Sequence, residues 1–324
     1  MKFSKSWAIA LWAATALVSD AASAQSFPSR PITVIMPFAG GSASDVVSRV
    51  LFNKMATLLG QPIVVENKPG AGGNLGTAMA AKATPDGYTL VGAASGPLAA
   101  NLTLYKELGY DPQKLVLISP FASFTIVVAA SKKLGVTTIK ELIERAKKEP
   151  GALNYGSVGI GSSQHLAGEY FAQIADVKLT HVPYRNIAQF GPDLMAGTVQ
   201  LGFAWYPNVS GPLAANGAVA LAVAGDARLS VLPNTVTTAQ AGLSQYTFDG
   251  WFGLGAPAGV PKDILERLNA ALNEALKDPT VLVRFEEIGA VPIGLGLDNA
   301  RTFLADEVAK YRDIITKAGI AKIE

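Results

Sequence analysis

The feature that most constrains the fold is a strand, a glycine-rich loop and a helix that follow one another and then recur. The apolar, β-branched segment ITVIMPF follows Pro31 and ends in a Gly/Ser cluster, and apolar residues at helical spacing run from Val46 to Leu59. The segment PIVVE from Pro62, the loop NKPGAGGN and a helix from about Leu75 to Ala83 repeat the unit. Alternating strands and helices predict an α/β domain with a mostly parallel sheet.

A second series of such units begins at the extended run FTIVVAASKKL. It continues with a helical pattern after Thr138, the segment LNYGSV, the helix HLAGEYFAQIA and the strands KLTHVPY and VQLGFAW. The last third adds the extended run YTFDGWFGLGAP, a helix opened by Pro261 and a C-terminal helix from about Asp298 to Ala318. A chain of 324 residues exceeds the size at which one core keeps growing. We therefore predict two doubly wound α/β domains, with crossing strands as a hinge and a ligand cleft between them.

The N-terminal segment has the order of a secretory signal peptide. Lys2 and Lys5 precede an apolar run from Trp7 to Val18, and Ala22-Ser23-Ala24 offers a small-x-small cleavage site. The alternative, a membrane anchor, needs about 20 apolar residues, which is longer than this run. We expect cleavage after Ala24 and an exported, periplasmic protein.

Charge and cysteine content exclude several classes of protein. The chain has 27 Lys plus Arg against 25 Asp plus Glu, a net charge of +2, which argues against a nucleic-acid partner. Because there is no cysteine, zinc ribbons, iron–sulfur clusters, thiol nucleophiles and disulfides are excluded, and His165 and His181 are the only imidazoles. We expect no cofactor and no metal.

Two glycine loops lie between a strand and a helix, where backbone N–H groups and the helix dipole attract an anion. The first spans Pro37 to Asp45, and its alternative role is a tight turn with Ser44 or Asp45 as a helix cap. The second spans Pro69 to Gly76 and only weakly resembles a dinucleotide fingerprint, since its glycines lie in the second turn and no acidic residue follows at the required distance. A second backbone-lined anion site and a simple turn both remain open for it.

The loop from Gly159 to His165 carries two hydroxyls and an imidazole at the start of a helix. A hydrolase pair of Ser163 and His165 is disfavoured, because the segment lacks the G-x-S-x-G spacing of a nucleophile elbow. Ligand hydrogen bonding by Ser162 and Ser163 and a plain helix start remain open.

Two strand ends carry larger side chains. Arg185 follows Tyr184 at one of them and can hold a distal carboxylate, or it is a surface arginine. Trp205 and Tyr206 lie at another strand end, where they either stack on an apolar or aromatic ligand body or belong to the core.

The order of these motifs resembles that of the tripartite tricarboxylate transporter substrate-binding proteins, the periplasmic Bug receptors. The matching segments are PSRPITVIMPFAGGSASDVVSR, GQPIVVENKPGAGGNLGTAMAAKATPDGYTL, NYGSVGIGSSQHLAGEYF, THVPYR, LPNTVTTAQAG and WFGLGAPAGVPKDILERLN. The resemblance implies a type II-like periplasmic-binding-protein fold without enzymatic activity. It implies a first domain of residues 25–124 and 226–324, a second domain of residues 125–225, and a hinge near Ser123–Ile126 and Ala222–Asp226.

The resemblance also implies that the two glycine loops and the Ser-Ser segment hold one carboxylate of the ligand. Arg185, Asn186 and Trp205 are then expected to read its distal end, although Asn186 and the segment FAWYPN depart from the usual family pattern. The expected ligand-binding residues are Phe38, Gly41, Ser42, Ser44, Asp45, Gly72, Gly73, Asn74, Ser95, Ser162, Ser163, His165, Tyr184, Arg185, Asn186 and Trp205.

The implied function is capture of a small carboxylate by a monomeric receptor for the membrane subunits of a tripartite transporter. We expect an aromatic or medium-chain dicarboxylate, terephthalate-like or adipate-like, rather than citrate, because about three charges would demand more than one arginine. A ligand-sensing receptor for a two-component system uses the same fold and remains an alternative. An exported hydrolase is the less favoured alternative.

Overall fold

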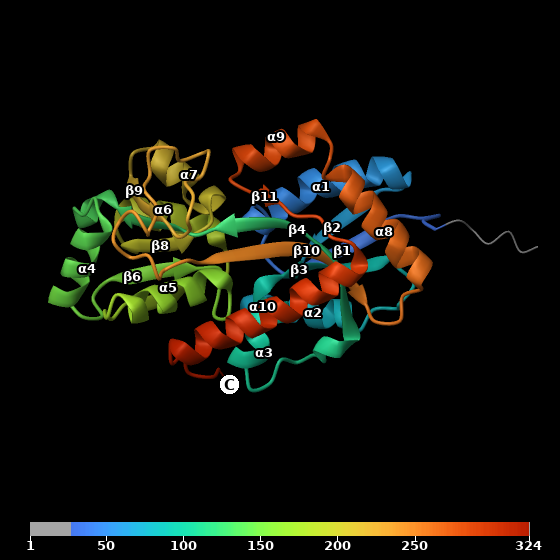
Figure 1. Cartoon of the computed structure of the whole chain (residues 1–324), viewed down its shortest axis with the longest axis horizontal. Coiled ribbons are helices and arrows are strands. Elements are labelled where there is room, and N and C mark those ends of the chain that lie inside the picture. Colours follow the sequence, from blue (N-terminus) through green and yellow to red (C-terminus); the bar gives the residue numbers. More distant parts are fainter. Residues whose placement is uncertain (1–26, 324) are drawn as a thin grey trace, which may run out of the picture.

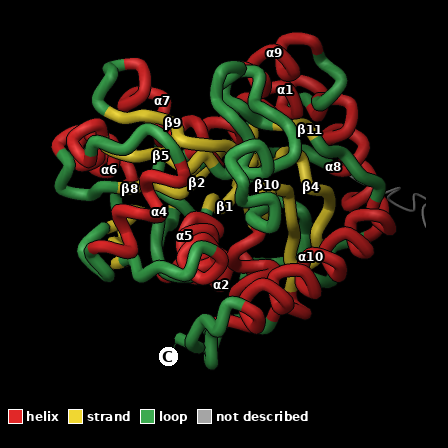
Figure 2. The backbone as a smooth tube through the Cα atoms, turned by 60° about the vertical axis from the view of Figure 1, so that its left-hand side comes forward, coloured by secondary structure: helices red, strands yellow, loops and turns green. Residues whose placement is uncertain are grey.

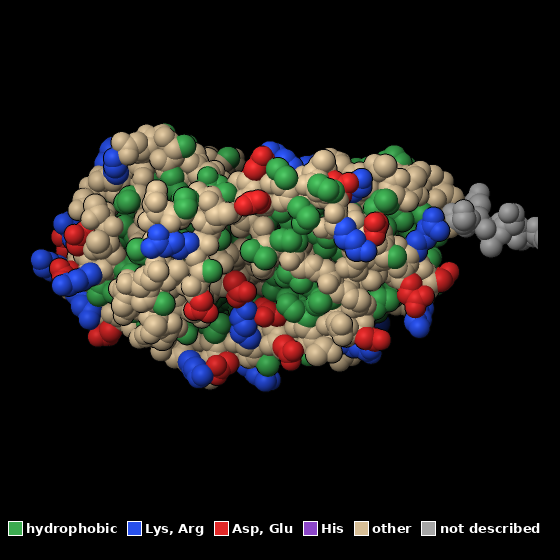
Figure 3. Space-filling view, turned by 45° about the horizontal axis from the view of Figure 1, so that its top comes forward, with side chains coloured by type: hydrophobic (Ala, Val, Ile, Leu, Met, Phe, Trp, Pro, Cys, Tyr) green, Lys and Arg blue, Asp and Glu red, His purple; other side chains and the backbone are tan. Residues whose placement is uncertain are grey.

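The computed structural model describes residues 27–323, which form two α/β lobes side by side (Figure 1). The predicted signal peptide, residues 1–24, lies outside the described residues. Within residues 27–323, no helix combines the length and apolar character needed to cross a membrane. On the face shown in Figure 3, basic and acidic side chains are interspersed rather than gathered in a field of one sign.

The first lobe is built on a six-stranded sheet in the order β11-β4-β10-β3-β1-β2. Its strands are β1 (Ile32–Met36), β2 (Ile63–Asn67), β3 (Thr89–Ala94), β4 (Leu115–Thr125), β10 (Asp249–Pro257) and β11 (Val291–Pro292). β1 pairs in parallel with β2 and β3, whereas β10 lies antiparallel between β3 and β4. Because Val34 pairs with both Val65 and Leu90, the centre of this sheet carries branched, apolar side chains.

Helices cover both faces of this sheet (Figure 1). They are α1 (Ala43–Leu59), α2 (Asn74–Ala81), α3 (Asn101–Leu104), α8 (Lys262–Ala275), α9 (Pro279–Glu287) and α10 (Leu297–Lys317). α1, α8 and α9 lie above the sheet in that view, and α2, α3 and α10 lie below it. Val47 and Leu51 on α1 and Leu268 and Leu272 on α8 are fully buried in the upper core. Their spacing of three or four residues places each pair on one helix face.

The second lobe repeats the arrangement with five strands in the order β7-β6-β8-β5-β9. Its elements are β5 (Val127–Ser131), α4 (Ile139–Lys148), β6 (Asn154–Ser157), α5 (Ser163–Ile174), β7 (Thr180–Pro183), α6 (Phe190–Ala196), β8 (Leu201–Ala204), α7 (Tyr206–Ala214) and β9 (Ala218–Val223). β6 pairs in parallel with β7 and β8, and β5 lies antiparallel between β8 and β9. In both lobes, a central sheet is covered by helices, as Figure 2 shows with strands in yellow and helices in red.

Two extended segments join the lobes. β4 of the first sheet continues through Ile126 into β5 of the second, and the chain returns through Ala224 and Phe248 to β10. These three residues hydrogen-bond to one another: Ile126 N donates to Phe248 O (3.1 Å), Ala224 N to Ile126 O (2.8 Å) and Phe248 N to Ala224 O (2.9 Å). The expected hinge segments lie at these crossings, and the boundaries between the domains stay a prediction.

Two helices were not predicted from the sequence. The sequence analysis placed Tyr206 at a strand end and predicted no helix after it, but α7 begins there, with Pro207 in its first turn, where a missing N–H costs nothing. α9 begins with Asp278, whose side chain accepts from Thr280 N, followed by Pro279. Asp followed by Pro is a recognisable helix start that the periodicity of the apolar residues alone does not reveal.

Candidate functional site

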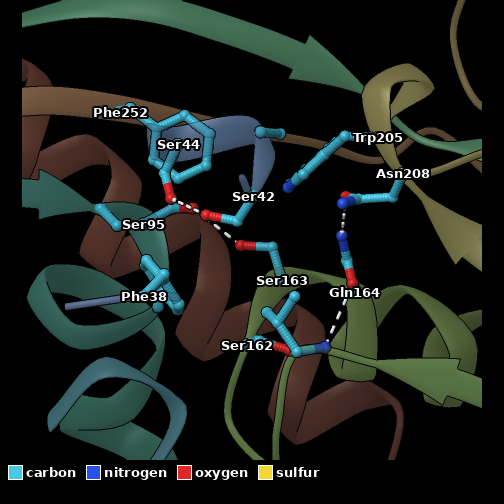
Figure 4. Close-up of a pocket in the computed structure, with 14 residues that line it drawn as sticks. Phe38, Ser42, Ser44, Ser95, Ser162, Ser163, Gln164, Trp205, Asn208 and Phe252 are labelled. Atoms are coloured by element: carbon cyan, nitrogen blue, oxygen red, sulfur yellow. Dashed lines mark hydrogen bonds between the residues drawn. The ribbon is translucent and has the colours of Figure 1, made fainter. Parts of the chain in front are cut away.

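A small cavity lies between the lobes and has a volume of ≈ 20 Å³ (Figure 4). It is lined by Phe38, Ser42, Ala43, Ser44, Ala94, Ser95, Gly96, Val158, Ser162, Ser163, Gln164, Trp205, Asn208 and Phe252. We call it the inner cavity. Since one water molecule needs about 10–15 Å³ by this measure, the inner cavity holds about one water and no dicarboxylate in this arrangement of the lobes.

Helix N-termini from both lobes converge on the inner cavity. α1 begins after Ser42 in the first lobe, and α5 begins after Ser162 in the second. Both serines cap their helices: Ser42 Oγ accepts from Asp45 N and Ser162 Oγ from His165 N. α7 begins after Trp205, which also lines the cavity. The positive ends of three helix dipoles therefore meet at one place, where a negative charge is stabilised.

Serine hydroxyls connect the two sides of the inner cavity. Ser42 Oγ and Ser44 Oγ lie 2.9 Å apart in the first lobe, and Ser95 Oγ lies 2.7 Å from Ser163 Oγ across the cleft. The lining contains no Lys, Arg, Asp, Glu or His. The inner cavity thus offers a negative group hydroxyls, backbone N–H groups and helix dipoles, and no side-chain cation.

Asp45 is buried beside this site but does not line it. Its carboxylate accepts from Gly41 N (3.0 Å), Arg49 Nε (2.9 Å) and Asn67 Nδ2 (3.0 Å). Burial alone raises the pKa of Asp45, but these hydrogen bonds and the Arg49 charge together lower it below its ordinary value. The hydrogen bond between Gly41 and Asp45 therefore helps to fix the shape of the first glycine loop. The Asp45 carboxylate is occupied by protein donors, and neither Asp45 nor Gly41 lines the inner or the outer cavity.

A larger cavity of ≈ 540 Å³ adjoins the inner one and shares Phe38, Ser42 and Val158 with it. We call it the outer cavity. Its other lining residues are Ala39, Pro69, Gly70, Ala71, Gly72, Tyr105, Gly159, Ile160, Pro183, Tyr184, Arg185, Ile187 and Ile323. Arg185 is the only charged side chain in this lining; it is exposed and makes no hydrogen bond or ion pair within residues 27–323.

The Tyr184 hydroxyl already has a protein partner. It donates to Asp193 Oδ2 at 2.7 Å. Burial and then this carboxylate raise the pKa of Tyr184 well above its ordinary value, so the phenol stays protonated. Tyr184 contributes its ring to the outer cavity wall.

His165 and His181 form a buried pair behind the serine loop. Their ring centroids lie 4.4 Å apart; Gly161 N donates to His165 Nδ1 at 3.3 Å, and His181 Nε2 lies 2.6 Å from Ser157 Oγ. Burial, with the neighbouring imidazole, lowers the pKa of His165 to about 3, and burial lowers that of His181 to about 4. Both imidazoles are neutral at pH 7. The Ser163 hydroxyl pairs with the Ser95 hydroxyl and not with His165, so His165 does not activate Ser163 as a nucleophile in this structure.

Three other residues expected at the site line neither cavity. Asn74 Oδ1 accepts from Asn101 Nδ2 at 2.7 Å inside the first lobe, and Gly73 lies beside Phe38 and Pro97. Asn186 is exposed, and its side chain accepts from Ala188 N at 3.2 Å.

Comparison with known proteins identifies the chain. A family model described as the tripartite tricarboxylate transporter family receptor matches residues 47–320. Protein BugT of Bordetella pertussis is 33% identical over 96% of this chain and 96% of its own length. The chain belongs to this receptor family.

Solved structures agree with this assignment. A protein of R. palustris whose structure is described with adipate is 32% identical, with a TM-score of 0.88 over 92% of this chain and 100% of its own. Another from Rhodopseudomonas palustris, described with bound malate, is 29% identical, with a TM-score of 0.82 over 89% of this chain and 100% of its own. The predicted binding-protein fold is confirmed, and the chain is a periplasmic solute-binding receptor of this family and not an enzyme.

Several residues that line the two cavities were not among the ligand-binding residues expected from the sequence. In the inner cavity these are Gln164, Asn208 and Phe252, and in the outer cavity Tyr105 and Ile323 are among them. Gln164 and Asn208 lie inside segments that the sequence analysis had singled out. Phe252 and Ile323 carry no local signal, because only the folding of the last third of the chain brings them to the cleft.

Proposed function

We propose that this receptor captures a small dicarboxylate, with one carboxylate in the inner cavity and the other directed to Arg185. The observation that carries the proposal is the convergence of the N-termini of α1 and α5, from opposite lobes, on a hydroxyl-lined cavity without a side-chain cation. Such a site suits one negative group whose charge helix dipoles and short hydrogen bonds can balance.

The single positive charge in the lining of the outer cavity favours a ligand with a second carboxylate and argues against a ligand with a third. Arg185 is the single cation there and has no protein partner among the described residues, so it is available to a distal carboxylate. A tricarboxylate would leave one charge without a cation. The adipate and malate named for the two structural relatives are both dicarboxylates.

The residues between the two ends suit an apolar ligand body. Phe38 and Val158 line both cavities, and Ile160 and Ile187 continue the apolar wall of the outer cavity. The apolar chain of an adipate-like ligand, or the ring of a terephthalate-like ligand, can be buried against this wall, because its transfer out of water sacrifices few hydrogen bonds.

Ligand entry requires the lobes to separate, because the inner cavity is too small in the present arrangement. The crossings at Ile126, Ala224 and Phe248 supply the hinge, and the domain boundaries predicted from the sequence lie near them. We infer that the closed, liganded receptor acts as a monomer and delivers the dicarboxylate to the membrane subunits of a tripartite transporter.

Thermal unfolding of the exported protein against a panel of carboxylates tests the proposal. The panel contains adipate, terephthalate, malate, citrate, hexanoate and aspartate, applied after refolding to remove carried-over ligand. A ligand at about 100 times its Kd stabilises the folded state by roughly 2.7 kcal/mol. We expect the largest rise in Tm with a dicarboxylate; a preference for citrate or hexanoate, or no rise with any compound, would overturn it.

A further inference from the structure

The indole N–H of Trp205 has no protein acceptor among the described residues and faces the inner cavity, where water or a ligand can reach it. Trp205 is 4% exposed, and its Nε1 makes no hydrogen bond within residues 27–323. In Figure 4 the nitrogen-bearing edge of the ring points into the inner cavity, toward Ser42 and Ser163. An indole N–H normally has an acceptor, and at Trp205 that acceptor has to come from the contents of the cavity.

Trp251 shows the usual arrangement in the same molecule. It is 2% exposed, and its Nε1 donates to Glu307 Oε2 at 3.0 Å. Both tryptophan residues are largely buried, but the Trp251 N–H is paired inside the protein, whereas the Trp205 N–H opens onto the inner cavity. The acceptor for Trp205 is therefore a group that occupies the cavity, either a water or an oxygen of the ligand.

Neighbouring residues fix the direction of the Trp205 ring before any ligand arrives. The ring lies 5.9 Å from the Phe124 ring and 6.5 Å from the Phe252 ring, measured between centroids. Its benzo edge lies on Gly250, where an added Cβ would be 2.7 Å from Cη2 and 2.9 Å from Cζ2. Aromatic neighbours and a close backbone contact thus hold the N–H in place, so binding needs little reordering of this side chain.

Asn208 offers a second donor at the same end of the cavity. Its Oδ1 accepts from Gln164 Nε2 at 2.9 Å, and Gln164 Oε1 in turn accepts from Val158 N at 3.2 Å. This chain of hydrogen bonds leaves Asn208 Nδ2 as the free end of the amide, with no hydrogen bond to any described residue. Trp205 Nε1 and Asn208 Nδ2 together form what we call the donor pair.

We propose that the donor pair is the specificity-determining element of the inner cavity, with Trp205 Nε1 donating a hydrogen bond to a carboxylate oxygen of the ligand. This assignment rests on the proposed function, because it assumes that a carboxylate occupies the inner cavity. The stacking role considered for Trp205 from the sequence is replaced by a hydrogen-bonding role at the head of the ligand. A ligand with an ammonium or methyl group at that position leaves the N–H unpaired and is rejected.

Trp205→Phe tests the assignment, because it keeps an aromatic ring and removes only the N–H and part of the ring. Isothermal titration with adipate, or with the tightest-binding dicarboxylate of the panel, should show about a 10- to 100-fold higher Kd, the usual loss of a hydrogen bond to a charged group. Trp251→Phe is the matched control: it removes an indole N–H that a protein carboxylate accepts, and it should change Kd by less than about threefold.

Indole ¹H–¹⁵N resonances provide a readout that does not depend on folding of the variant. In the wild-type protein, the indole signal that is absent from Trp205→Phe should move downfield on addition of the dicarboxylate, and the Trp251 signal should stay. An unchanged Kd in Trp205→Phe, or an unshifted Trp205 signal in a saturated wild-type protein, would overturn the role of the donor pair alone. A wild-type protein that binds no dicarboxylate would overturn the proposed function and this assignment together.

Discussion

Single residues decide how closely the lobes approach, and Gly72 lies at the tightest contact. Its φ is +60°, and a Cβ added there would lie 2.2 Å from the Ile160 carbonyl oxygen of the opposite lobe. Two independent reasons therefore favour glycine at this position: the backbone is left-handed, and the second lobe approaches too closely for a side chain.

Gly72→Ala should weaken ligand binding because it obstructs closure. We expect a Kd for the dicarboxylate that is at least about 10-fold higher, with a loss of stability of about 1 kcal/mol from backbone strain. Titration calorimetry and urea unfolding measure the two effects. Gly135→Ala is the matched control, since Gly135 has φ +76° with no atom within 4 Å of an added Cβ. Equal Kd values for the two variants would contradict the closure argument.

Arg185 gives a prediction about the distal end of the ligand. Arg185→Gln should raise the Kd for adipate about 10-fold, because a charge-assisted hydrogen bond is lost. Hexanoate, which lacks the second carboxylate, should bind the variant and the wild type equally. Arg267→Gln removes another exposed arginine, on α8 in the first lobe, and should leave both affinities unchanged. Parallel loss for adipate and hexanoate would show that Arg185 does not read the distal carboxylate.

At the scale of elements, the start of α5 is supported from behind by the buried histidine pair. His165 lies on α5, and His181 lies on β7 next to β6, so the pair connects the helix to the sheet under the serine loop. Tyr155 of β6 adds a hydrogen bond from its hydroxyl to Glu169 Oε1 on α5 at 2.6 Å. These contacts support the loop of Ser162 and Ser163 from behind, and none of the supporting side chains lines the inner or the outer cavity.

Acid should destabilise the folded receptor through this pair. In the unfolded chain both histidines titrate near 6.5, whereas the folded pKa values are about 3 and about 4. Below pH 6.5 the unfolded state therefore binds more protons, and the free energy of unfolding falls by up to about 1.4 kcal/mol per pH unit for each histidine until the folded pKa is reached. Because the chain has 2 His in total, urea unfolding between pH 7 and pH 5 reports mainly on this pair. His181→Gln should reduce the slope by about half; an unchanged slope would contradict the assignment.

At the scale of the whole molecule, the two lobes touch each other across the cleft, and the inner cavity between them is almost closed, with a volume of ≈ 20 Å³. Besides the Ser95–Ser163 contact, Tyr105 Oη donates to Ile160 O at 2.9 Å. In this arrangement the inner cavity has no room for a carboxylate group of a ligand. We therefore expect the lobes to open about the crossing segments when a ligand enters the inner cavity.

Distances across the mouth of the cleft should report this motion. The chain contains 0 Cys, so Glu66→Cys in the first lobe and Gln189→Cys in the second can be spin-labelled specifically. Both positions are exposed. Pulsed EPR should show a longer or broader distance distribution without ligand and a single shorter distance with saturating dicarboxylate. The same distribution in both samples would argue against hinge closure.

Local sequence patterns were sufficient for most elements and for part of the site. Parts of the first glycine loop and the Ser162-Ser163 segment line the inner cavity, since each lies between a strand and a helix whose N-terminus faces the cleft; their role in holding a ligand stays a prediction. Asp45 and His165 could not be assigned in the same way. Their side chains are directed to Arg49, Asn67 and Gly161, and these partners become apparent only in the folded chain.

The sequence by itself determined the alternation of strands and helices, the two glycine loops and the family, because these depend on neighbouring residues and their order along the chain. Only the tertiary structure decided which donors remain free in the cleft. Trp205 and Trp251 are both largely buried residues. Glu307 of α10 accepts a hydrogen bond from Trp251 Nε1, whereas Trp205 Nε1 has no acceptor among the described residues. The physical reason is that a hydrogen bond depends on distance and direction between groups far apart in sequence, which no local pattern encodes.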